Sequence, residues 1–375
     1  MRRRPASARS RPPERVEAAV LEQRIRTRWT ELVGVRHPIV QTGMGWVAGP
    51  HLVTATAKAG ALGILASATM SYDELAAAIR AVKERTDAPF GVNLRADAAD
   101  APERVELLIT EGVRVASFAL APNRELIAKL KDAGVVVVPS IGARRHAEKV
   151  AAWGVDAVVV QGGEGGGHTG GVATSLLLPQ VTAAVDIPVL AAGGFFDGRG
   201  LAAALAYGAE GIAMGTRFLL TSDSRVPDAV KALYLAADVN GTVATPKIDG
   251  VPHRVLRTGL VEQIERSGTV TGLLRSARNG LAFQKMTGMS LRAMLRDGLA
   301  MRRHYGLRLG QVVMAANTPM LLRAGLVNGD PAAGVLSAGQ VTGLIEDLPS
   351  CAELVERIIG EAVAATARAS AAVVG

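Results

Sequence analysis

The chain is poor in cysteine, in aromatic residues and in long apolar runs, and each shortage excludes a class of protein. Cys351 is the only cysteine among 375 residues. This excludes a disulfide framework and favours a reducing compartment, so we expect a cytoplasmic protein. Cys351 also lies far from the predicted catalytic loops, which argues against a cysteine nucleophile. No apolar run reaches the roughly 18 residues of a membrane span, so no membrane partner is expected.

The net charge of +8 is concentrated at one end of the chain. Residues 1–15 hold six arginines and one glutamate and so contribute +5. Aromatic residues do not interleave these arginines, as a single-strand nucleic-acid surface would require, and no apolar segment marks a secretory signal. We predict that residues 1–20 form a disordered basic tail and that the protein binds no nucleic acid. An organelle-targeting peptide is the alternative for this tail.

Eight short apolar runs recur along the chain with about 25 residues between their starts. Each is of the kind that is buried on both faces of a parallel sheet. The predicted strands are Pro38–Gln41, Leu62–Leu65, Phe90–Leu94, Val113–Phe118, Val135–Val138, Ala157–Val160, Ile187–Ala191 and Gly211–Met214.

Helix signals lie between these runs. Ser71 with Glu74 forms a capping box, and Asp100, Asn123 and Asp197 mark further helix starts. Glycines at 112, 134, 154 and 208 mark helix ends. Eight alternations of strand and helix predict an α/β protein with a (β/α)8 barrel over residues 31–220; an open doubly wound sheet is the alternative.

The remaining residues, 221–375, exceed what one barrel needs. We predict a mostly helical region that covers the substrate and packs on the barrel, with its connectors rich in glycine, proline and asparagine. Its predicted helices are Val226–Ala237, Leu291–Arg302 and Cys351–Ala365.

The segment Val158–Gly170 carries the strongest chemical signal. A buried strand ends at Gln161 and opens into a run of glycines in which Glu164 and His168 are the only ionisable residues. Glycines let backbone N–H groups approach a flat or anionic ligand, and an imidazole can move a proton near neutral pH. The segment contains a formal G-x-G-x-x-G, but it follows the sixth strand of a series, so a dinucleotide fingerprint is rejected. A flexible glycine linker between domains is the non-functional alternative.

In a barrel, functional residues gather at the carboxyl ends of the strands. Amide side chains at two strand ends can pair with the edge of a planar heterocycle, a methionine can contact its face, and glycines after the seventh and eighth strands are where barrels hold a phosphate. FMN fits this set, and FAD does not, because no adenosine-binding fold is visible. No metal site is predicted. The residues concerned are Met44, Asn93, Gln161, Gly194 and Gly215.

Several motifs give the chain a resemblance to a known family. Gln-x-x-Met after the first strand, Pro-Phe-Gly-Val-Asn at 89–93, the loop at 161–168, Ala-Ala-Gly-Gly at 191–194 and Met-Gly-Thr-Arg at 214–217 resemble the 2-nitropropane dioxygenase or nitronate monooxygenase superfamily over residues 31–366. The resemblance implies an FMN-dependent TIM barrel with an active-site role for His168. The FMN contacts that it implies are Met44, Asn93, Gln161, Gly166, Gly194, Gly215 and Thr216.

One departure bears on the substrate. Nitronate monooxygenases usually have a proline before the methionine of the first loop, whereas this chain has Gly43 before Met44, and Trp46 follows. A glycine loosens the loop and Trp46 can wall the pocket, which argues against a small nitronate. Within the family, residues 40–48, 93–100, 193–199 and 314–320 resemble a branch of flavin enzymes of bacterial steroid degradation that dehydrogenate a cyclic CoA thioester.

Desaturation of a thioester needs a base for the α proton and an acceptor for the β hydride, and His168 is the candidate base. Positive side chains at Arg95, Arg217 and Arg254 are candidates to pair with CoA phosphates. Nitronate oxidation, flavin-dependent reduction of an enoyl thioester, and a flavin-binding protein without turnover are the alternatives. NAD(H) as an external electron carrier and a homo-oligomeric assembly remain open.

Overall fold

The computed structural model describes residues 24–119, 123–266 and 318–373. The predicted basic tail and the predicted helix Leu291–Arg302 lie outside these residues.

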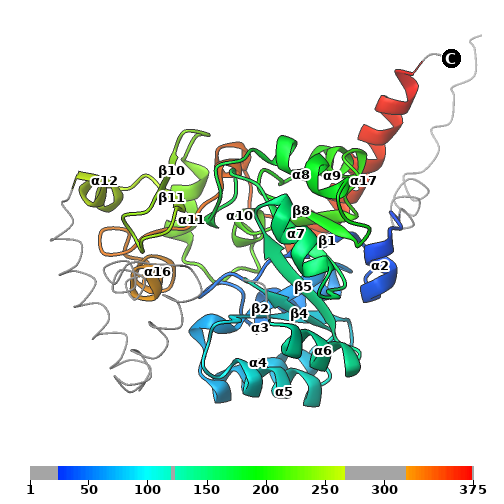
Figure 1. Ribbon diagram of the computed structural model, residues 1–375. Coiled ribbons are helices and arrows are strands. Elements are labelled where there is room, and N and C mark those ends of the chain that lie inside the picture. The colour runs from blue at the N-terminus through cyan, green and yellow to red at the C-terminus, as the bar shows by residue number, and fades with distance from the viewer. Residues whose placement is uncertain (1–23, 120–122, 267–317, 374–375) are drawn as a thin grey trace, which may run out of the picture.

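A closed barrel of eight parallel strands forms the core, and all eight predicted strands are confirmed (Figure 1). The first and last strands close the ring, with Val40 beside Ala213. The strands are buried almost throughout, which explains why their sequences are continuous apolar runs. In order around the barrel they are β1 (Ile39–Gln41), β2 (Leu62–Ala66), β3 (Phe90–Leu94), β4 (Val115–Phe118), β5 (Val136–Ile141), β6 (Val158–Gln161), β8 (Val189–Ala192) and β9 (Gly211–Met214).

Helices connect these strands around the outside. They are α3 (Pro50–Lys58), the short η1 (Ser67–Thr69), α4 (Tyr72–Lys83), α5 (Ala101–Thr110), α6 (Arg124–Asp132), α7 (Arg144–Ala151), α8 (Thr174–Thr182), α9 (Gly198–Ala206) and α10 (Thr216–Leu219). The capping box of Ser71 is confirmed, and Asn123 and Asp197 cap α6 and α9 through their side chains. Asp100 does precede α5, but its carboxylate makes no cap bond and pairs with Arg104 instead, at 2.8 Å.

The amino-terminal end of the barrel is closed by α2 (Arg28–Val33). Its Trp29 is fully buried and packs with the inward-facing side chains of the strands, among them Val40, Val115 and Leu190. A bulky indole at this end fills the interior and leaves the opposite end for a ligand.

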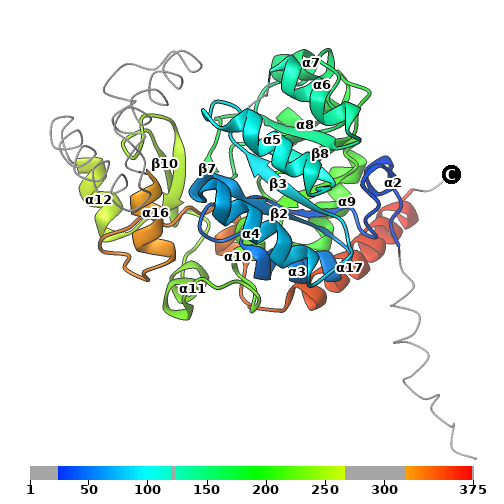
Figure 2. The same ribbon diagram turned by 90° about the horizontal axis from the view of Figure 1, so that it is seen from below.

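The chain beyond the barrel contains strands that the sequence analysis did not anticipate. Its elements are α11 (Asp228–Leu235), β10 (Thr242–Thr245), β11 (His253–Leu256), α12 (Gly259–Arg266), α16 (Thr318–Leu326), η2 (Gln340–Leu344) and α17 (Cys351–Ala371). β10 and β11 form an antiparallel hairpin, and β11 pairs with β7 (Gly167–His168), two residues of the glycine loop after β6. A strand of two residues carries no periodic signal and forms only because β11 offers an edge. Figures 1 and 2 place this sheet with α12 and α16 on one side of the barrel.

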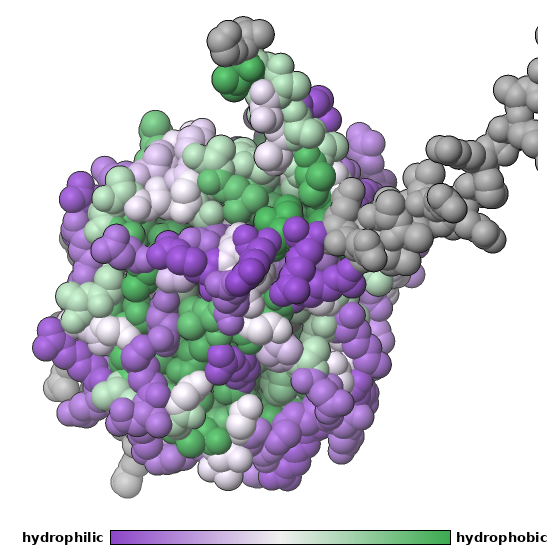
Figure 3. Space-filling view, turned by 90° about the vertical axis from the view of Figure 1, so that its right-hand side faces the viewer, coloured by the Kyte–Doolittle hydropathy of each residue, from purple (hydrophilic) through white to green (hydrophobic). Residues whose placement is uncertain are grey.

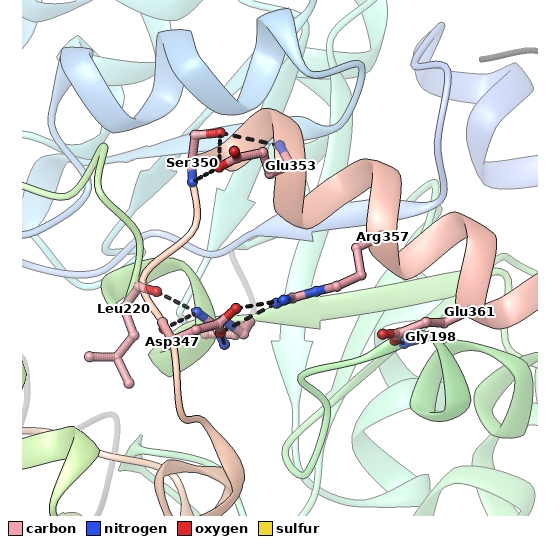
Figure 4. A network of polar contacts seen from close by, with 8 residues as sticks. Gly198, Leu220, Asp347, Ser350, Glu353, Arg357 and Glu361 are labelled. Atoms are coloured by element: carbon pink, nitrogen blue, oxygen red, sulfur yellow. Dashed lines mark hydrogen bonds and ion pairs between the residues drawn. The ribbon is translucent and has the colours of Figure 1, made fainter. Parts of the chain in front are cut away.

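The last helix, α17, packs against α9 on the barrel wall (Figure 2). Gly198 permits this approach, because a Cβ there would overlap backbone atoms of Ile358 and Ala362. Its N–H donates to Glu361 at 2.8 Å (Figure 4). The predicted helix at 351–365 is confirmed and continues to Ala371.

The surface around α17 mixes hydrophilic and hydrophobic side chains. On the face shown in Figure 3, hydrophobic residues gather near the root of the protruding end of α17. No helix among the described residues is both long enough and apolar enough to span a membrane.

Candidate functional site

The loops after β1 and β3 meet at the carboxyl end of the barrel. Gly43 lies against Asn93, so closely that a Cβ at position 43 would stand 2.5 Å from the Cβ of Asn93. The Asn93 amide also donates to Ser117 at 3.3 Å. A proline at position 43 would therefore displace Asn93, which gives a physical reason for the glycine that distinguishes this loop. The buried Gln41 Oε1 has no partner among the described residues.

The glycine loop after β6 is rigidly held. The Gln161 amide donates to the backbone oxygen of His168 at 2.7 Å. A Cβ at Gly165 would stand 2.6 Å from the Gln161 amide nitrogen, so this glycine is required. The carboxylate of Glu164 accepts from the Thr174 backbone N–H at 3.0 Å and from its hydroxyl at 2.8 Å. Glu164 thus caps the start of α8, a structural task, and the flexible-linker alternative is excluded.

Glycines from three strand ends form a cradle beside this loop. Gly193 and Gly194 both take positive φ, at 86° and 89°, which a residue with a side chain rarely adopts. A Cβ on Gly215 would stand 3.4 Å from the sulfur of Met44. The Thr216 hydroxyl accepts from the N–H of Gly339 at 2.9 Å, and this brings the segment before η2 against the cradle.

This arrangement fits FMN. At Gly194 a Cβ would meet no atom closer than 3.8 Å, so its backbone is open to a ligand, whereas at Gly166 it would stand 2.6 Å from the Gly339 nitrogen. Gly194 and Gly215 would hold the phosphate, with Thr216 and Gly166 shaping the cradle. Met44, Asn93 and Gln161 lie at the strand ends where the ring would rest.

His168 lies on β7 with 59% of its side chain exposed, and its Nε2 is 2.7 Å from Asp249 Oδ2. Asp249, in the β10–β11 connection, is almost fully buried, as is His253 on β11, whose Nδ1 is 3.2 Å from the same oxygen. Burial alone would raise the pKa of Asp249, but hydrogen bonds and charge from the two imidazoles outweigh it and hold that pKa well below its ordinary value. Burial lowers the pKa of His253, which favours its neutral form.

The three candidate arginines are engaged within the protein. The Arg254 guanidinium donates to the backbone oxygen of Gly163 at 2.9 Å and so braces the glycine loop. Arg217 is 2% exposed and forms an ion pair with Asp347 at 2.9 Å. Arg95 pairs with Asp97 at 2.9 Å.

Figure 4 shows the network around Asp347, which also receives Arg357 of α17. Burial lowers the pKa of Arg217, and the charge of Asp347 opposes that shift. The network joins the loop after β9 to the C-terminal helix.

Trp46 connects the loop after β1 to α16. Its φ of 67° is rare for a bulky residue, and its indole N–H donates to Pro319 at 3.0 Å. The Arg323 guanidinium carbon lies 5.6 Å from the ring centroid, within cation–π range. Trp46 therefore lies between the barrel and α16.

Cys351 takes no part in this site. It is fully buried at the start of α17, and burial raises the pKa of its thiol to about 12.

An eight-stranded barrel with a glycine cradle and an imidazole at its carboxyl end defines a class of flavin-type TIM-barrel oxidoreductases. Comparison with known proteins confirms the class. The nitronate monooxygenase family profile matches residues 26–105 and 101–361. The chain belongs to this family, for which FMN is a family property, and it is an oxidoreductase.

Two relatives are similar over almost their whole length. The chain is 66% identical over 353 residues to the (3aS,4S,5R,7aS)-5-hydroxy-7a-methyl-1-oxo-octahydro-1H-indene-4-carboxyl-CoA dehydrogenase of Mycobacterium tuberculosis, covering 93% of this chain and 99% of that protein. It is 65% identical over 339 residues to the dehydrogenase of the same name from Rhodococcus jostii, covering 90% and 96%. Among solved structures, FabK from Thermotoga maritima superposes with a TM-score of 0.75 at 34% identity, covering 93% of this chain and all of that one.

The sequence analysis missed Asp249, His253, Thr318 and Ser337. A signal for the first two existed: Asp249–Gly250 is a turn dipeptide, and the alternating His253–Leu256 follows it, as in a hairpin. Thr318 and Ser337 carry no local signal, because only the tertiary fold brings them to the site.

Proposed function

We propose that the protein is an FMN-dependent dehydrogenase of a cyclic acyl-CoA, acting on the bond next to the thioester. The observation that carries this proposal is the exposed His168 imidazole, bonded to a buried carboxylate beside a glycine cradle that fits FMN. The names of the two relatives supply the substrate class.

His168 would remove the α proton of the thioester. The carboxylate on its Nε2 would stabilise the imidazolium that results, so that the proton moves to a base whose charged form is already balanced. Bound FMN supplies an acceptor for the hydride that leaves the β carbon.

A groove between α7 and α8 suits the nucleotide end of CoA. It has a volume of about 380 Å³, and its lining includes the apolar Ala143, Val172 and Leu177 together with Arg144, Arg145 and Glu148. Arg145 is exposed and makes no hydrogen bond or ion pair within the described residues, whereas Arg144 pairs with Glu148. A cation beside apolar walls fits a phosphate joined to an adenine.

The reach is also suitable. Val172 is four residues from His168, so at most roughly 14 Å separates their Cα atoms. The pantetheine arm of CoA spans roughly 12 bonds, about the same length as four extended residues.

Two measurements test the proposal. Flavin released by denaturation should be FMN, and recovery of FAD, or of no flavin after reconstitution, would contradict it. Under anaerobic conditions a ring-carboxyl CoA thioester should bleach the flavin faster than an alkyl nitronate or NADH. Bleaching by the nitronate alone would favour monooxygenase activity, and bleaching by NADH alone would favour a thioester reductase.

His168→Gln should retain FMN, because the backbone contacts of the loop remain. Reduction of the flavin by the thioester should slow by about 10²-fold to 10⁴-fold, the usual contribution of general acid–base catalysis. Weaker substrate binding with an unchanged limiting rate would instead assign the residue to binding. A cytoplasmic location and a homo-oligomeric state remain predictions.

A further inference from the structure

Asp249 is a buried carboxylate on which three separate segments converge. Besides the two imidazoles, the Thr318 hydroxyl of α16 donates to Oδ2 at 2.8 Å, and the backbone N–H of Val251 donates to Oδ1 at 3.3 Å. Three of these four donors share Oδ2, and Oδ1 accepts from the Val251 N–H. Because its Oδ2 serves both imidazoles and the Thr318 hydroxyl, Asp249 acts through the groups that it holds.

The charge of Asp249 fixes the protons on both rings. Because its pKa is well below the ordinary value, Asp249 is ionised and only accepts hydrogen bonds. His168 must then carry its proton on Nε2, and His253 on Nδ1. The other nitrogen of His253, Nε2, is 2.7 Å from the Ser337 hydroxyl and accepts from it, which matches a neutral ring.

We propose that Asp249 is a positioning residue that presents Nδ1 of His168 as the atom that takes the substrate proton. This inference rests on the proposed function. Nδ1 is the nitrogen of His168 that the carboxylate leaves available, and pairing of β7 with β11 places His168 opposite His253.

The neutral state of His253 is part of the arrangement. The ring centroids of His168 and His253 are 4.8 Å apart, so two positive charges would repel each other. Burial keeps His253 uncharged, and the single carboxylate is then free to balance an imidazolium at His168.

A divalent metal is the competing interpretation, since His168, Asp249 and His253 offer ligand atoms within 4.8 Å of one another. Two ligands of a tetrahedral ion with bonds near 2.0 Å lie roughly 3.3 Å apart. The 2.7 Å contact between His168 and Asp249 is shorter and matches a direct hydrogen bond.

The tautomers can be measured on the FMN-loaded protein without substrate. The chain has six histidines, so ¹⁵N-histidine labelling with two-bond correlation spectra gives a tractable set, assigned through His168→Gln and His253→Gln. We expect the Nε2–H tautomer at His168 and the Nδ1–H tautomer at His253. The Nδ1–H tautomer is the one that histidine in water disfavours. Nε2–H at His253, or stoichiometric metal in the purified protein, would overturn the proposal.

Asp249→Leu removes the acceptor. We expect His253 to lose its Nδ1–H form and reduction of the flavin by the thioester to slow by about 10²-fold or more, with FMN affinity unchanged. Asp249→Asn keeps the size of the side chain and can keep an oxygen toward its donors. Should the leucine variant not fold, the asparagine variant tests the charge alone, and a rate within threefold of the parent would refute the role.

Asp238→Asn, at an exposed carboxylate between α11 and β10, is the matched control and should change neither readout. If the tautomers are as expected but no thioester reduces the flavin, the proposed substrate is wrong while the assignment of the protons is supported.

Discussion

Replacing Gly43 by alanine tests whether the loop after β1 and the end of β3 together form the ring side of the flavin site. The new Cβ would stand 2.5 Å from the Cβ of Asn93, whereas carbon atoms in contact prefer about 3.5–4.0 Å. Neither atom is at the end of a flexible side chain, so the backbone must move by roughly 1 Å. Overpacking of this kind costs about 1–3 kcal/mol.

We expect this cost to appear in FMN binding, because Asn93 is the group displaced. A loss of about 1–3 kcal/mol raises the FMN Kd by about 5-fold to 150-fold, measured by the quenching of FMN fluorescence on titration with apoprotein. Gly49→Ala is the matched control: it lies in the same loop with negative φ, and a Cβ there would meet no atom within 4 Å.

A double substitution tests whether Gly43 acts through Asn93. Asn93→Gly removes the opposing Cβ, so in that background Gly43→Ala should weaken FMN binding by less than threefold more. If the two changes add fully, or if Gly43→Ala behaves like Gly49→Ala, then Gly43 does not act through Asn93.

Four further changes have defined outcomes. Arg145→Glu should raise KM for a CoA thioester by about tenfold but leave KM for the corresponding thioester without the nucleotide unchanged; equal effects on both would exclude the groove. Asp347→Asn should lower the free energy of unfolding by about 1–3 kcal/mol in a thermal melt, because the buried Arg217 charge is left poorly paired. Arg217→Met should leave the free energy of unfolding nearly unchanged and should keep KM in steady-state kinetics. Trp29→Ala should cost about 3–5 kcal/mol in chemical denaturation yet leave FMN affinity unaltered, since it empties the opposite end of the barrel. Because the pKa of Asp249 is depressed in the folded protein, its contribution to stability is present above its unfolded pKa near 3.8 and is lost as the pH falls below that value. The melting temperature of Asp249→Asn should therefore fall less steeply than that of the parent below about pH 4.

The barrel could be predicted from the sequence because each of its strands is a local signal. A run such as 158–160, three consecutive valines, is apolar throughout and lies between two helices, so its type and place in the series are evident without tertiary contacts. The sheet beside the barrel could not be predicted in the same way. β7 has two residues, Gly167 and His168, and its backbone pairs only because β11, about 85 residues later, supplies an edge.

The candidate site also contains some residues that local sequence predicts and others whose contacts depend on the tertiary fold. The residues proposed to hold the flavin, such as Asn93 and Gly194, lie at the carboxyl ends of strands, a position that the sequence predicts. The arginines show the opposite limit. Arg217 and Arg254 have the right charge for CoA phosphates, but whether a guanidinium is engaged by Asp347 or by the Gly163 carbonyl depends on contacts that no local pattern records.

The cofactor cradle and the partners of His168 come from different parts of the chain. The barrel supplies the glycine backbone that fits FMN. The carboxylate that pairs with His168, Asp249, and its partners His253 and Thr318 all lie beyond residue 220. Thr318 opens the same helix whose Pro319 accepts from Trp46, so α16 contacts both the loop after β1 and the carboxylate that pairs with His168. A substitution in α16 can therefore change both the position of Trp46 and the hydrogen bonds of Asp249 while the cofactor cradle stays intact. Relatives that share the barrel but differ in this segment should accordingly differ in substrate and in rate more than in FMN affinity.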